Sequence, residues 1–171
     1  NQNLRLVDVG TGSGVIAITL ALELPNVEVL ATDISPEALQ VAKANAASLQ
    51  ANVTFHQGDF LEPLNYQQKT VDIIVSNPPY IAESEREELS DTVKLYDPDL
   101  ALFAEDDGLA AYKKIIKQAK SVLKEDSLIA LEIGYTQGEA VKKLLLDSFP
   151  QSEVKLIQDI NGKNRIIIAK L

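Results

Sequence analysis

The tetrapeptide Asn-Pro-Pro-Tyr at residues 77–80 follows directly on the apolar run 71–76. Two consecutive prolines fix φ, supply no backbone N–H, and keep Asn77 out of the helical region. The pattern predicts a rigid, extended exit from a strand, with an amide side chain held at its carboxyl end. That amide offers one acceptor and two donors, and Tyr80 adds a flat face with a polar tip. A plain strand-ending turn is the alternative reading.

A second motif is the glycine-rich segment 10–14, which lies between an apolar strand pattern and the helical run 15–22. Strand, glycine-rich turn and helix in this order are typical of a nucleotide-binding loop. Asp33 ends another strand pattern roughly twenty residues on, where a carboxylate accepts hydrogen bonds from a ribose diol. The GxGxG spacing lacks the third glycine of the dinucleotide fingerprint, which favours a ligand without a pyrophosphate. An ordinary tight turn is the alternative.

Composition excludes several classes of protein. The 171 residues, 46% hydrophobic and 24% charged, suit one globular domain. The chain has no cysteine, which excludes disulfides, thiolate metal sites and cysteine nucleophiles. No His/Asp/Glu cluster has metal-ligand spacing and no apolar run is long enough to span a membrane, so we expect neither a metal nor a membrane partner. A cytoplasmic monomer is expected.

The formal net charge is −9. Proteins that bind nucleic acid broadly present a basic face to the phosphates. The charge therefore argues against direct nucleic-acid binding, although a local basic patch is compatible with it.

Apolar runs and helical patterns alternate along the chain. Strands are predicted near residues 5–10, 28–33, 53–58, 71–76, 127–133, 153–160 and 165–171, and helices near 14–24, 36–49, 107–124 and 137–148. Alternation of this kind predicts an α/β fold with a mostly parallel, doubly wound sheet. The turn sequence at 161–164 joins the last two strands as a hairpin, so these two should pair antiparallel.

Four polar features fall at the carboxyl ends of successive predicted strands. They are the glycine-rich segment, Asp33, the pair Asp59-Phe60, and Asn77. In open α/β sheets, ligands bind outside the carboxyl ends of the strands. The four features are therefore expected to meet at one rim.

Together these motifs resemble the class I S-adenosylmethionine-dependent methyltransferases, and within them the release-factor glutamine methyltransferases (the HemK/PrmC family). The resemblance runs from Asp8 to Arg165. Its matches are Asp8 to Gly14, Asp33-Ile34-Ser35, Ala38-Leu39, Ala42, Asn45-Ala46, Gly58-Asp59-Phe60, Val75 to Ile81, Ala101-Leu102, Gly108-Leu109, Glu132-Ile133-Gly134, Gln137-Gly138, Asp159 and Arg165. Two departures are Tyr96-Asp97-Pro98, where the family has Tyr-Glu-Pro, and Phe60, where it often has Trp.

The resemblance implies a Rossmann-like sheet of seven strands in the order 3-2-1-4-5-7-6, with the last strand antiparallel. It implies that residues 1–171 form the catalytic domain, without the small helical domain that precedes it in the family. It also implies S-adenosyl-L-methionine as cofactor and S-adenosyl-L-homocysteine as product.

Roles for the cofactor site follow from this resemblance. The turn should wrap the methionine part of the cofactor. Asp33 should hold the ribose hydroxyls, and Asp59 should accept a hydrogen bond from the adenine amino group, with Phe60 packing near the ring. Asp8 should either orient the turn or meet the cofactor ammonium. The expected cofactor-binding residues are Gly10, Thr11, Gly12, Ser13, Gly14, Asp33, Asp59, Phe60 and Asn77.

The expected catalytic residues are Asn77 and Pro78, whose side-chain and backbone carbonyls should accept hydrogen bonds from a substrate NH₂. Pro79 and Tyr80 complete the expected substrate site. An amide nitrogen is a poor nucleophile, so the task is positioning and electrostatics, and no strong general base is required. By resemblance, the substrate is a glutamine in the Gly-Gly-Gln loop of peptide-chain release factors.

Two rival functions stay open at this point. An adenine exocyclic-amine methyltransferase acting on DNA, RNA or tRNA would use the same tetrapeptide to hold an NH₂ group. A non-catalytic nucleotide-binding module would explain the glycine-rich turn but gives no reason for the Asn-Pro-Pro-Tyr sequence.

Other polar residues carry weaker signals. The single histidine, His56, is expected in the core or on an edge strand rather than in catalysis. The acidic segment 83–88 is expected to be a solvated face, with a role in gripping the substrate as the alternative. Asp159 and Arg165 flank the last turn and are expected to form a salt bridge.

Overall fold

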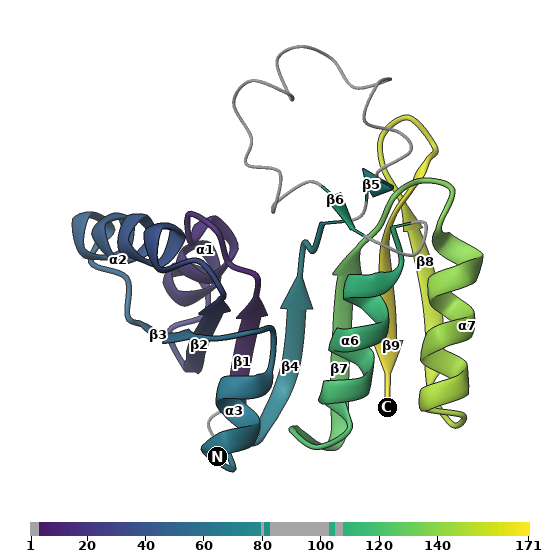
Figure 1. The fold of residues 1–171 in the computed structure, drawn as a ribbon, viewed down its shortest axis with the longest axis horizontal. Coiled ribbons are helices and arrows are strands. Elements are labelled where there is room, and N and C mark those ends of the chain that lie inside the picture. The colour runs from purple at the N-terminus through teal and green to yellow at the C-terminus, as the bar shows by residue number, and fades with distance from the viewer. Residues whose placement is uncertain (1–3, 80, 83–102, 105–107) are drawn as a thin grey trace.

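The computed structural model describes residues 4–79, 81–82, 103–104 and 108–171, and Figure 1 shows a central sheet with helices on both faces. The strands are β1 (Leu4–Val9), β2 (Val27–Asp33), β3 (Val53–Gln57), β4 (Val71–Ser76), β5 (Ile81–Ala82), β6 (Phe103–Ala104), β7 (Leu123–Glu132), β8 (Glu153–Gln158) and β9 (Asn164–Lys170). The helices are α1 (Val15–Glu23), α2 (Pro36–Leu49), α3 (Glu62–Tyr66), α6 (Ala110–Ala119) and α7 (Gly138–Ser148). None of these helices has the length and apolar character needed to cross a membrane.

The main sheet has the order β3-β2-β1-β4-β7-β9-β8. When its seven strands are numbered along the chain, this is the predicted order 3-2-1-4-5-7-6. Strand β9 runs antiparallel to both of its neighbours, while the other pairs are parallel. The predicted fold class is therefore confirmed.

The middle of the sheet is buried on both faces, as parallel strands require, with four consecutive buried residues in β1 and in β2. On one face a small cluster of Leu6, Val29 and Ala31 packs against Ala17 of α1. On the other face the larger cluster includes residues of β1, β4 and β7 together with residues of α6 and α7. Figure 1 shows α1 and α2 stacked together, apart from α6 and α7. The strand ends are thus held between two helical layers.

The predicted helix over 107–124 is wrong at its carboxyl end. Helix α6 ends at Ala119, and β7 begins at Leu123, four residues before the predicted start near 127. Leu123 pairs with Val71, whose N–H donates to the carbonyl of Val122 at 2.8 Å. An apolar Val-Leu pair fits a helix or a strand equally well, and pairing with β4 decided between them.

Three short elements were not predicted. Helix α3 has five residues, too few for a helical period to show, and β5 and β6 have two residues each. Helix α3 packs directly against the turn after β3. Its Pro63 lies so close to Gly58 that a Cβ on that glycine would be 2.4 Å from the proline Cγ.

This contact generates a stability prediction. Replacing Gly58 by Ala should lower the free energy of unfolding by about 1–3 kcal/mol, because the new methyl group overpacks Pro63. Urea unfolding of the variant beside Asn52→Ala, an exposed position just before β3, measures it. A Gly58→Ala midpoint equal to that of the control would contradict the close packing of α3.

Candidate active site

The glycine-rich turn connects β1 to α1 and is anchored on the end of β2. Gly10, Gly12 and Gly14 all have left-handed φ angles, of 69°, 58° and 85°, which favour glycine. The N–H groups of Gly10 and Thr11 both donate to the carbonyl of Thr32, each at 2.9 Å. The backbone of the turn is therefore fixed with its glycines in conformations that side chains disfavour.

Asp33, the last residue of β2, is joined to the same turn. One carboxylate oxygen accepts from the N–H of Gly12 at 2.8 Å, and the other accepts from the N–H of Ser35 at 2.9 Å. The side chain of Asn45 in α2 donates to the carbonyl of Ser13 at 2.9 Å. Asp33 thus lies against the turn as predicted from the spacing, and its binding of a ribose stays a prediction.

Asp8 is a buried carboxylate beneath the turn, with 1% of its surface exposed. Its Oδ2 accepts from the hydroxyl of Thr11 at 2.6 Å and from the N–H of Ala17 at 3.1 Å. Within the described part of the chain, its Oδ1 has no hydrogen-bond partner. Burial raises the pKa of Asp8 to about 6, and the nearby carboxylate of Asp33 adds to the rise. These contacts fit the orientation of the turn, which was one of the two roles expected for Asp8.

The residues after β3 face α6. Asp59 is half-buried and forms an ion pair with Lys114. Phe60 has a left-handed φ of 53°, which is uncommon for a bulky residue, and packs against the larger core cluster. Binding of adenine at Asp59 and Phe60 stays a prediction.

The end of β4 presents Asn77 at the surface, with Pro78 buried and Pro79 half-buried behind it. The hydroxyl of Ser76 donates to the carbonyl of Val9 at 2.6 Å, which ties this strand end to the end of β1. The structure therefore exposes the amide and buries its proline support. Tyr80 lies outside the described residues.

Four neighbouring strands bring these groups together. Val9 is in register with Thr32 on one side and Ser76 on the other, and Asp33 is in register with Gln57. Adjacent strands lie roughly 4.8 Å apart, so β3 to β4 spans about 14 Å. The glycine-rich turn, Asp33, Asp59 and Asn77 lie at or just after the carboxyl ends of these strands and therefore share one edge of the sheet.

The remaining candidates lie away from this edge or fit structural roles. His56 is half-buried on the edge strand β3, with ring nitrogens 3.3 Å from Gln67 and Lys69, and burial followed by the Lys69 charge lowers its pKa. Arg165 and Asp159 form the expected salt bridge at 3.5 Å.

Two further expectations concern metals and the acidic segment. A search of the described residues finds no group of three His, Cys, Asp or Glu side chains able to hold a metal ion. Segment 83–88 lies outside the described residues.

Four residues that bond to the glycine-rich turn or to the segment after β3 had no predicted role. They are Thr32, Asn45, Lys114 and Gln118. Lys114 and Gln118 are four residues apart and so lie on one face of a helix, a spacing that marks them as a pair. The spacing does not show which segment of the chain this face contacts.

Solved methyltransferases share this fold. Ribosomal protein L11 methylase from Lactobacillus delbrueckii subsp. bulgaricus is 25% identical, with a TM-score of 0.68, over 99% of this chain and 71% of that one. The Thermus thermophilus 16S rRNA N2 G1207 methyltransferase, in complex with AdoMet and guanosine, is 16% identical, with a TM-score of 0.63, over 97% of this chain and 37% of that one. The chain thus shares the fold of these methyltransferases.

The chain matches the family model described as a methyltransferase domain over residues 1–164, and it belongs to that family. It is 53% identical, over 97% of its length, to the release factor glutamine methyltransferase of Bacillus subtilis (strain 168), of which it covers 58%. It spans 58–62% of the length of seven bacterial relatives with this name. The resemblance drawn from the motifs is confirmed.

The buried carboxylate of Asp8 generates a pH prediction. Because its pKa rises from 3.8 unfolded to about 6 folded, the stability that this group contributes is present below pH 3.8 and lost as the pH rises to about 6. Asp8→Asn keeps an acceptor for Thr11 and Ala17 but cannot ionise. The stability of the variant relative to wild type should therefore increase by about 2–3 kcal/mol between pH 4 and pH 7.

Thermal or urea unfolding of both proteins across that pH range measures the difference. Two parallel curves would show that Asp8 does not titrate in this window.

Proposed function

We propose that the chain is the catalytic part of an S-adenosylmethionine-dependent enzyme that methylates a glutamine side-chain amide in a protein. The proposed target is the Gly-Gly-Gln loop of peptide-chain release factors in the cytoplasm. The observation that carries the proposal is the position of Asn77 and Pro78, which directly follow β4, the strand that pairs with β1 just before the glycine-rich turn. The name shared by the bacterial relatives supports the choice of substrate.

The residues present fit this cofactor. The amino end of α1, which begins directly after the turn, favours a carboxylate, whereas the N–H groups of Gly10, Thr11 and Gly12 are already bonded to the end of β2. The third glycine, Gly14, comes one residue earlier than in the dinucleotide fingerprint, which favours a ligand without a pyrophosphate. Asp33 would hold the ribose and Asp59 the adenine amino group, each at a neighbouring strand end. When bound, S-adenosylmethionine supplies a methyl group on a sulfonium, which is already an activated donor.

The work of the chain's own residues is then to orient the acceptor nitrogen. The lone pair of an amide nitrogen is delocalised into its carbonyl, so the nitrogen attacks only when it is well placed. The side-chain oxygen of Asn77 and the carbonyl of Pro78 would each accept one hydrogen bond from the substrate NH₂. Two acceptors also favour the positive charge that develops on the nitrogen. The rigid Pro-Pro backbone keeps both acceptors in place.

The substrate class can be tested directly. Methyl transfer from labelled cofactor to a release factor should require its glutamine and should vanish when that residue is Glu, because a carboxylate oxygen would meet two acceptors. Excess duplex DNA or tRNA should not compete, since the net charge of −9 offers polyanions no general attraction. Label in adenine, with none in the release factor, would favour the nucleic-acid rival.

A second prediction separates positioning from cofactor binding. Asn77→Ala should cut methyl transfer by about 10²-fold or more while leaving cofactor affinity within a few-fold of wild type, because it removes a contact to the reacting nitrogen. Asn77→Asp keeps the acceptor but loses the amide donors and adds a charge. Calorimetry with the cofactor and single-turnover transfer measure the two effects.

Asn26→Ala is the matched control, because this exposed asparagine precedes β2 at the opposite edge of the sheet. Transfer by Asn77→Ala at the wild-type rate would rule out the amide-gripping role.

A further inference from the structure

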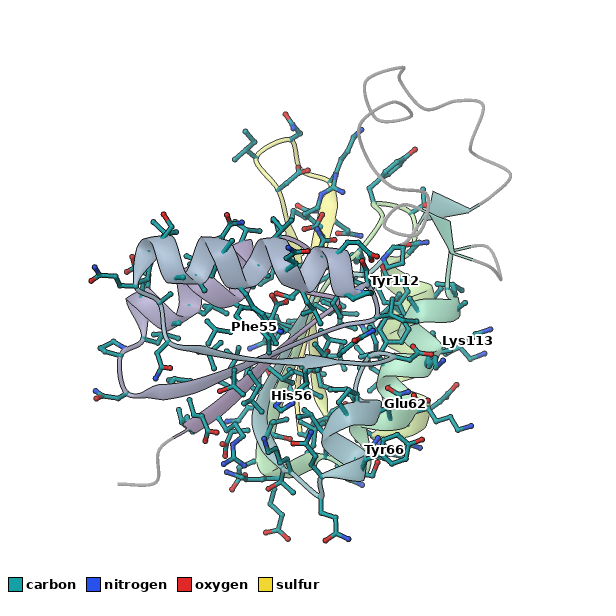
Figure 2. The ribbon with its side chains drawn as sticks, turned by 60° about the vertical axis from the view of Figure 1, so that its left-hand side comes forward. Phe55, His56, Glu62, Tyr66, Tyr112 and Lys113 are labelled. Carbon is teal, nitrogen blue, oxygen red and sulfur yellow. The ribbon has the colours of Figure 1, made fainter. Side chains whose placement is uncertain are left out.

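One face of α6 is bonded to the segment that follows β3. Lys114, Gln118 and Ser121 are spaced by four and three residues, so they lie on one side of the helix and its carboxyl end. The Lys114 ammonium pairs with the carboxylate of Asp59, and the Ser121 hydroxyl donates to the side-chain oxygen of Asn65 at 2.7 Å. Figure 2 shows α3, with Glu62 and Tyr66 labelled, close to α6, where Tyr112 and Lys113 are labelled.

Gln118 forms hydrogen bonds with the backbone on both sides of Phe60. Its side-chain oxygen accepts from the N–H of Leu61 at 2.7 Å, and its side-chain nitrogen lies 3.4 Å from the carbonyl of Asp59, to which it donates. Between these two contacts Phe60 has the left-handed φ of 53°. Such a conformation is disfavoured for a bulky side chain and persists where its surroundings fix it. The two bonds from Gln118 supply that constraint.

The conformation at Phe60 sets the direction of its neighbour. A change of backbone dihedral at Phe60 would swing the Asp59 side chain away from the edge of the sheet. Lys114 adds a second constraint, because its ion pair uses Oδ2 of Asp59 and its ammonium lies 6.0 Å from the centre of the Phe60 ring. The other oxygen, Oδ1, is then the one we assign to a ligand.

We propose that Gln118 and Lys114 are positioning residues that set the base specificity of the cofactor site. The inference rests on the proposed function, in which Asp59 accepts a hydrogen bond from the adenine amino group. A carboxylate accepts hydrogen bonds and cannot donate them, so it selects an amino group and repels a carbonyl oxygen at the same ring position. Gln118 and Lys114 hold the Asp59 carboxylate in the position from which it distinguishes an amino group from a carbonyl oxygen.

A merely structural role for α6 makes a different prediction. Loosening the packing of α3 would weaken every ligand of the site alike. A change in the orientation of the Asp59 carboxylate would weaken the binding only of the ligand that carries the amino group. The ratio of two affinities therefore separates the explanations.

The experiment compares S-adenosylhomocysteine with S-inosylhomocysteine, in which a carbonyl replaces the amino group at C6 of the base and the adjacent N1 carries a proton. Calorimetry should show wild type preferring the adenosine ligand by about 10–100-fold, the range of a hydrogen bond to a charged group. In Gln118→Ala, S-adenosylhomocysteine should bind about tenfold more weakly while S-inosylhomocysteine changes little, so the ratio falls. Lys114→Ala should lower the ratio in the same direction, and Lys114→Arg should keep it, because the charge remains.

Lys117→Ala is the matched control. Lys117 is exposed on the same helix, and no hydrogen bond or ion pair involves it within the described residues. Its variant should keep the wild-type ratio.

Equal weakening of both ligands in the Gln118 and Lys114 variants, or an unchanged ratio, would overturn the inference while leaving the proposed function standing. A wild-type protein that binds both ligands equally would also overturn it. A wild-type protein that binds neither would contradict the proposed function itself, and the inference with it. If Gln118→Ala fails to fold, the affinity ratios of Lys114→Ala and Lys114→Arg test the inference.

Discussion

The end of β2 holds the glycine-rich turn, and the rest of the site depends on that attachment. The carbonyl of Thr32 accepts from the N–H groups of Gly10 and Thr11, and the carboxylate of Asp33 accepts from the N–H of Gly12. Backbone groups at the ends of parallel strands lack partners within the sheet, so they are free to bind a neighbouring turn. Here one strand end organises the turn that opens α1 and presents its own carboxylate beside it.

This attachment concentrates unfavourable features at one edge of the molecule. Asp8 is buried beneath the turn with one oxygen unpaired among the described residues, and burial raises its pKa to about 6. Phe60, which follows the end of β3, adopts a left-handed conformation. Both features cost stability and both are held by surrounding hydrogen bonds. Local rules are broken most often where a protein binds or reacts, so their position is consistent with a ligand site.

Helix α6 links two parts of this edge that are far apart in the sheet. Near its amino end, the hydroxyl of Tyr112 donates to the carbonyl of Glu132 at 3.0 Å, at the end of β7. Towards its carboxyl end, Gln118 clasps the turn after β3. The helix therefore braces strand ends that flank β2, β1 and β4 on either side. A rigid brace of this kind suits the proposed function, which relies on positioning rather than acid–base chemistry.

The sequence by itself determined the features that arise from local constraints. Glycine spacing, the Pro-Pro dipeptide and the alternation of strand and helix patterns act over a few residues, and they predicted a mostly parallel α/β sheet with these motifs at one rim. The strand order was implied by the family resemblance and is confirmed. The partners of Asp59 and Leu61 lie 55 and 57 residues further along the chain, and only the tertiary structure places them. The burial of Asp8 likewise depends on how closely α1 packs over β1. Such contacts depend on where a helix crosses the sheet, which no short stretch of sequence encodes.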